Sequence, residues 1–92
     1  MSDLKTEFEA AVEFVRTAKG DYKPSQDLQL EMYALFKQAT EGDIHGKKPG
    51  FTDVVGKAKY SAWERLKGMS REEAMKRYVD HASEVKEKYF TS

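Results

Sequence analysis

The feature that most constrains the fold is a helical spacing of apolar residues that recurs in four segments of the chain. Three breaks rich in glycine or proline separate them: KGDYKPS, EGDIHGKKPGF and KGMS. This pattern predicts helices over residues 3–18, 25–41, 53–67 and 70–89. Because no stretch alternates convincingly with a period of two, no strands are expected.

Residues that begin and end helices agree with these boundaries. Ser25 is a candidate N-cap for the second segment, and Gly42 follows its end. Gly68 follows the third segment. The fourth opens with Ser70 and has Glu73 three residues later, which is the pattern of a capping box.

These segments predict an all-α fold, a four-helix bundle in one domain over residues 1–92. A chain of this size buries only about 60% of its unfolded surface, so the core is modest. The loop between the second and third helices has about ten residues, enough to cross the bundle. The topology therefore need not be simple up-and-down.

Composition narrows the class of protein. Sixteen basic residues balance sixteen acidic ones, which argues against a general nucleic-acid binder. The chain has no cysteine, so disulfide scaffolds and thiolate metal sites are excluded. The polar N-terminus does not resemble a signal peptide, and no apolar run approaches the roughly 20 residues of a membrane span. We expect an intracellular protein.

The second helix carries two distinct stripes. Its core stripe consists of Leu28, Met32, Leu35, Phe36 and Ala39. Leu30, Tyr33 and Lys37 fall on another side of the same helix. The pattern alone leaves two interpretations open: ordinary surface residues, or a groove in which a hydroxyl and an ammonium hold an anion beside an apolar group.

The third helix repeats this combination, because Lys57, Lys59 and Tyr60 lie together near its start. Its core side is expected to consist of Val55, Ala58, Ala62 and Leu66, with Trp63 at the margin. In the fourth helix, Tyr78 belongs to a wide apolar band and is expected in the core.

Catalytic machinery is not expected. The chain has no thiol and no recognisable nucleophile motif. Its two histidines, His45 and His81, lack the partners of a triad or of a spaced metal set. We expect both side chains to be solvated, with no catalytic residue and no metal site.

Four motifs carry a resemblance to a known family. They are YALFKQAT followed by GDI at 33–44, KPGF at 48–51, GKAKYSAW followed by LKG at 56–68, and SREEAMKRY at 70–78. On these motifs the chain resembles the acyl-CoA-binding protein family from residue 8 to about residue 89. The resemblance implies a bundle of up-down-down-up topology.

The resemblance also implies a function. Such a protein binds medium- to long-chain acyl-CoA esters non-covalently and acts as a cytoplasmic carrier and pool former. It is expected to be a monomer, to have no enzymatic activity and to use no cofactor. It does not bind nucleic acid or insert stably into membranes, and it can deliver its ligand to acyl-CoA-using enzymes. The alternative is a small helical protein-interaction module without a small-molecule ligand. RNA binding through Lys47, Lys48, Lys57 and Lys59 is a weaker third interpretation.

The resemblance assigns site residues by position: Arg16, Leu30, Tyr33, Phe36, Lys37, Lys59, Tyr60 and Tyr78. Tyr33 and Lys37 correspond to the pair that grips the ribose 3′-phosphate, with Lys59 converging from the third helix. Arg16 falls where a basic residue often reaches the headgroup.

The remaining positions concern the adenine and the acyl chain. Phe36 lies where an aromatic residue approaches the adenine, Tyr78 matches a tyrosine that closes over the nucleotide, and Leu30 is placed near the acyl chain. Three residues depart from the usual pattern: Tyr60 replaces a tryptophan, Val55 a lysine and Gln29 an apolar residue. The departures bear on affinity and chain-length preference, which the sequence does not define.

Overall fold

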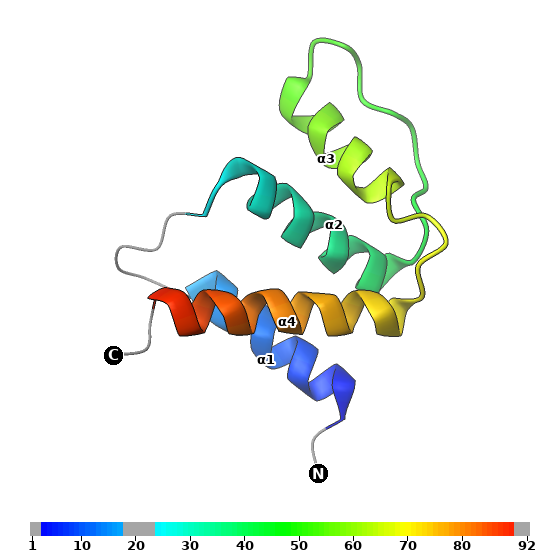
Figure 1. Cartoon of the computed structure of the whole chain (residues 1–92). Coiled ribbons are helices and arrows are strands. Elements are labelled where there is room, and N and C mark those ends of the chain that lie inside the picture. Colours follow the sequence, from blue (N-terminus) through cyan, green and yellow to red (C-terminus); the bar gives the residue numbers. More distant parts are fainter. Residues whose placement is uncertain (1–2, 18–23, 90–92) are drawn as a thin grey trace.

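The computed structural model describes residues 3–17 and 24–89 and contains four helices. They are α1 (Leu4–Thr17), α2 (Gln26–Glu41), α3 (Val54–Glu64) and α4 (Arg71–Tyr89) (Figure 1). Within the described ranges no residue forms a strand. The predicted all-α class is confirmed.

The helices are arranged so that α4 and α2 form the centre of the bundle. Helix α1 packs on α4, α2 packs on both α4 and α3, and α3 packs on α2. Figure 1 shows α2 and α3 running in the same direction, while α1 and α4 run the opposite way. The loop over residues 42–53 returns along the bundle to join α2 to α3, which gives the up-down-down-up topology.

Side-chain caps account for two of the predicted helix starts. The Ser25 hydroxyl accepts a hydrogen bond from the Leu28 amide at 3.1 Å, and the Ser70 hydroxyl accepts one from the Glu73 amide at 3.0 Å. Each bond satisfies an amide that has no partner inside its helix. The Glu73 carboxylate pairs with Arg77 at 3.4 Å.

The third helix is shorter than predicted. It begins after Asp53, whose carboxylate accepts a hydrogen bond from the Gly56 amide at 2.9 Å, and it ends at Glu64 rather than at residue 67. Residues 65–68 instead form tight turns, in which the Leu66 amide donates to the Trp63 carbonyl at 2.9 Å. Gly68 has a φ of +94°, a conformation that favours glycine. The expected end of the first helix at residue 18 lies outside the described residues.

The core is built from one face each of α1, α2 and α4. Its buried members are Phe8, Ala11, Met32, Leu35, Ala39, Ala74, Tyr78 and Ala82. The Phe8 ring stacks near Phe36 with centroids 6.2 Å apart and meets the edge of Tyr78 at 5.2 Å. The prediction that Tyr78 belongs to the core is confirmed.

A polar cluster that sequence reasoning missed joins the ends of α2, α3 and α4. Gln38 is fully buried, and its amide donates to the Met69 carbonyl at 2.7 Å and to the Asp43 carboxylate at 2.9 Å. The same Asp43 oxygen accepts from the Gly68 amide at 2.8 Å. The bond from Gly68, followed by that from Gln38, lowers the pKa of Asp43. The cluster ties the loops before and after α3 to α2.

Two expectations for α3 were wrong. Val55 was expected on the core side but is 65% exposed, whereas Trp63, expected at the margin, is buried. The Trp63 indole N–H donates to the Gly42 carbonyl at 2.9 Å. Helix α3 packs on α2 without reaching the main core. The side of α3 that faces α2 is therefore the side that carries Trp63, not the side that carries Val55.

Replacing Trp63 by Phe tests how α3 is held. The variant loses the bond to Gly42 and part of the buried ring, so we expect the free energy of unfolding to fall by about 1–2 kcal/mol. Tyr60→Phe removes a polar group from the same helix and should change it by less than about 0.5 kcal/mol. Chemical denaturation measures both. Equal effects of the two substitutions would show that Trp63 does not anchor α3.

Candidate ligand site

The candidate site is centred on Tyr33, which projects from α2 toward α3. The Tyr33 side chain is half-buried, and the ammonium of Lys59 on α3 lies 5.3 Å from the centroid of its ring. A cation at this distance over an aromatic face is attracted to it. The packing of α2 on α3 therefore brings together two of the residues predicted for the phosphate site.

Lys37 lies one turn further along α2. Its ammonium is 5.0 Å from the centroid of the Trp63 ring on α3, and it forms an ion pair with Glu41. Its side chain is 23% exposed, so it is partly open to solvent. We refer to the line along which Tyr33 and Lys37 of α2 meet Lys59 and Trp63 of α3 as the α2–α3 seam.

Glu41 and His45 continue the arrangement beyond the end of α2. The Glu41 carboxylate contacts His45 Nε2 at 3.0 Å, and the His45 ring meets the edge of Trp63 with centroids 5.3 Å apart. The hydrogen bond from Lys37 is the main cause that lowers the pKa of Glu41. His45 is 64% exposed, as expected of a solvated residue, although it also packs on the indole.

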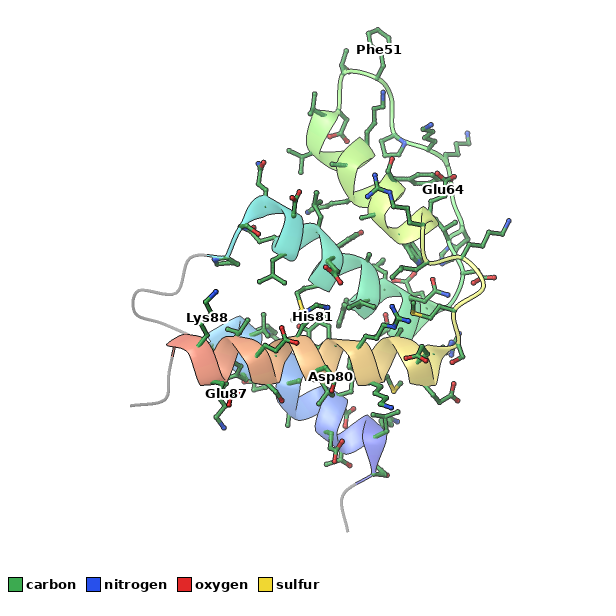
Figure 2. All side chains as sticks on the ribbon, in the orientation of Figure 1. Phe51, Glu64, Asp80, His81, Glu87 and Lys88 are labelled. Carbon is green, nitrogen blue, oxygen red and sulfur yellow. The ribbon has the colours of Figure 1, made fainter. Side chains whose placement is uncertain are left out.

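The expectation that His81 is solvated was wrong. Its Nε2 lies 2.8 Å from the Glu31 carboxylate, and its side chain is 26% exposed. In Figure 2 the labelled His81 lies between α4 and α2. Because Glu31 belongs to α2 and His81 to α4, the pair links two helices that also share the core.

A cavity of about 580 Å³ lies beside Tyr33, between α1, α2 and α4. Its walls include four predicted site residues: Arg16 from α1, Tyr33 and Phe36 from α2, and Tyr78 from α4. This volume falls within the roughly 300–1,000 Å³ usual for ligand pockets. Gln29 also lines it, and its side-chain amide donates to the Pro24 carbonyl at 3.1 Å.

A second groove, of about 680 Å³, runs between α2 and α3. Its apolar floor consists of Leu30, Ala34, Ala58, Ala62 and Leu66. Sequence reasoning placed Leu30 near an apolar ligand group but did not identify this groove. The sequence signal that could have indicated the groove is the presence of alanines at positions 34, 58 and 62, since small side chains on facing helices leave room between them.

Not all of the predicted site residues share one cavity. Leu30 lines the groove rather than the cavity beside Tyr33, whereas Lys37, Lys59 and Tyr60 line neither. Tyr60 is half-buried on α3. The two lysines instead lie on the α2–α3 seam, which joins the cavity through Tyr33.

Over residues 3–17 and 24–89, no three His, Asp or Glu side chains gather as metal ligands would. In the same ranges, no helix combines the length and the apolar character needed to cross a membrane.

The fold and these side chains define a small all-α bundle with a ligand-sized cavity next to a cationic, aromatic seam. The family model described as acyl CoA binding protein matches residues 5–82. The chain therefore belongs to the acyl-CoA-binding protein family.

Individual proteins support this assignment. The chain is 41% identical to acyl-CoA-binding domain-containing protein 5 of Bos taurus over 85 residues, covering 90% of this chain and 16% of that protein. It is 47% identical to acyl-CoA-binding domain-containing protein 5A of Danio rerio over 75 residues, covering 79% of this chain and 15% of that protein. The chain thus spans about a sixth of the length of these relatives.

Solved structures share the whole fold. The crystal structure of ACBP from Moniliophthora perniciosa superposes with a TM-score of 0.90 at 44% identity, covering 100% of this chain and 87% of that one. The crystal structure of Oryza sativa acyl-CoA-binding protein 2 gives 0.86 at 33% identity, covering 98% and 100%.

Proposed function

We propose that this protein binds medium- to long-chain acyl-CoA esters non-covalently along the α2–α3 seam. The observation that carries the proposal is the placement of Lys59 over Tyr33, with Lys37 one turn away. Membership of the family and the shared fold support acyl-CoA binding in general. The roles of the individual residues are part of the proposal.

The headgroup chemistry fits this seam. Coenzyme A carries a ribose 3′-phosphate and a diphosphate, and charge-assisted hydrogen bonds to phosphate are roughly twice as strong as neutral ones. Lys37, Lys59 and the Tyr33 hydroxyl would donate these hydrogen bonds to the phosphates. The Lys37 ammonium would then pair with phosphate in place of Glu41. Arg16, Phe36 and Tyr78 line the adjoining cavity, where the half-buried Phe36 ring would offer a face for the adenine.

The acyl chain accounts for the larger part of the affinity. Burying a methylene contributes about 0.8 kcal/mol, so a palmitoyl chain contributes on the order of 10 kcal/mol before ordering costs. Nanomolar affinity requires about 12 kcal/mol in total. The α2–α3 groove, with Leu30 and small alanines on its floor, supplies an apolar path. Head and tail together reach tight binding on a domain too small for a deep pocket.

The biological role we propose is a cytoplasmic, monomeric carrier that holds acyl-CoA in a pool and releases it to acyl-CoA-using enzymes. Proteins of this family bind ligand without catalysing a reaction, and we extend that property to this chain. The competing interpretation is a helical interaction module without a small ligand. Only a carrier is stabilised against thermal unfolding by added acyl-CoA, since a ligand that binds the folded state raises stability by mass action.

Replacing Lys37 by Ala tests the phosphate site. We expect palmitoyl-CoA affinity measured by calorimetry to fall by about 1.5–3 kcal/mol, because a charged hydrogen bond to phosphate is lost. Thermal stability should change little, since the ion pair with Glu41 is partly exposed. The matched control is Lys76→Ala, which removes an exposed lysine from α4. Affinity equal to that of the unmodified protein would show that the phosphates bind elsewhere.

Comparing ligand fragments tests the division between head and tail. Palmitoyl-CoA should bind far more tightly than either free coenzyme A or palmitate, because each fragment supplies only one group of contacts. Titration of all three into the same protein measures the difference. Comparable affinities for palmitate and palmitoyl-CoA would exclude a contribution from the nucleotide site.

A further inference from the structure

The most exposed apolar side chains among the described residues gather where the crossing loop enters α3. Phe51 is 84% exposed, Val54 74% and Val55 65%. None of the three lines the cavity or the groove of the proposed ligand site. Figure 2 shows the labelled Phe51 at the tip of this loop, at the end of the molecule farthest from α1 and α4.

The tip has a defined backbone conformation. The Asp53 amide donates to the Gly50 carbonyl at 3.0 Å, which closes a turn with Phe51 and Thr52 at its corners. Asp53 then caps α3 through the Gly56 amide at 2.9 Å. The fold therefore holds the Phe51 ring outward on a short turn, and the nearest carboxylate is engaged with the helix.

Positive charge accompanies the apolar tip. Lys47 and Lys48 are exposed, and Pro49 alone separates them from the turn. Phe51 follows Lys48 by three positions, so their Cα atoms lie within about 11 Å of each other. This separation is close to the Debye length of about 8 Å at physiological salt. The lysine charges are therefore only partly screened at a surface that the Phe51 ring contacts.

We propose that Phe51, Val54 and Val55, together with Lys47 and Lys48, form a peripheral docking surface for an anionic lipid bilayer. An aromatic ring and two valines can enter the boundary between headgroups and acyl chains while the lysines remain at the lipid phosphates. Three side chains cannot supply the roughly 800 Å² per partner of a standard protein interface. One short apolar tip with two lysines provides weak, reversible attachment rather than insertion.

Vesicle sedimentation tests the surface in the absence of acyl-CoA. We expect the protein to bind phosphatidylcholine vesicles that contain about one third phosphatidylserine, and to bind pure phosphatidylcholine much less. Lys47→Ala/Lys48→Ala should weaken binding about twenty- to thirtyfold, at about fivefold per lysine. Phe51→Ala should weaken it at least about tenfold. Lys76→Ala/Lys86→Ala on α4 makes the same change in net charge and should bind as the unmodified protein does.

A fluorescent label reports which end of the molecule meets the lipid. Because the chain has no cysteine, Thr52→Cys and Ser83→Cys each allow one environment-sensitive dye to be attached, at the tip and on α4. Only the dye at residue 52 should shift to the blue with phosphatidylserine vesicles. Equal shifts at both positions would overturn the proposal.

Other outcomes would overturn it as well. These are no binding that depends on phosphatidylserine, full binding by Phe51→Ala, or self-association through Phe51 seen by light scattering in place of vesicle binding. Palmitoyl-CoA affinity is measured on the same variants and should be unchanged in Phe51→Ala. If the unmodified protein binds palmitoyl-CoA but not the phosphatidylserine vesicles, the lipid surface alone is rejected. If it binds the vesicles but not palmitoyl-CoA, the proposed function alone is rejected.

Discussion

The packing of Trp63 against α2 is the interaction on which the position of α3, and with it the α2–α3 seam, depends. Helix α3 packs on α2 but not on α1 or α4 over the described residues, so its position rests on one helical neighbour. The buried indole and its hydrogen bond to the Gly42 carbonyl hold α3 against α2. The cluster of Gln38 and Asp43 fixes the loops before and after α3. Lys59 reaches Tyr33 because this contact places α3 alongside α2.

Helix α2 serves both the core and the proposed site. Met32, Leu35 and Ala39 are buried against the other helices, while Tyr33 and Lys37 stay half-buried along the seam. Lys37 does not point freely into solvent, because Glu41 and the Trp63 ring already hold it. A phosphate would therefore meet an ammonium that is already oriented, which lowers the entropy lost on binding.

Much of the fold could be predicted from the sequence, because apolar spacing and the caps at Ser25 and Ser70 act locally. The end of α3 could not be predicted. At the turns after Glu64, the Gly68 amide donates a hydrogen bond to the Asp43 carboxylate, which is distant in the sequence. Trp63 and Val55 were misplaced because periodicity does not show that α3 has only α2 to pack on. For the candidate site, the resemblance identified the residues, but only the folded structure shows that the cavity beside Tyr33 is separate from the groove lined by Leu30.

The most direct test of the seam as a ligand site is a titration of the ¹⁵N-labelled protein with palmitoyl-CoA followed by NMR. We expect the chemical-shift changes to concentrate on α2 around Tyr33 and Lys37, on α3 around Lys59, and on Arg16 and Tyr78 at the adjoining cavity. Changes confined to the outer faces of α1 and α4, with the signals of α2 and α3 unmoved at saturation, would contradict it.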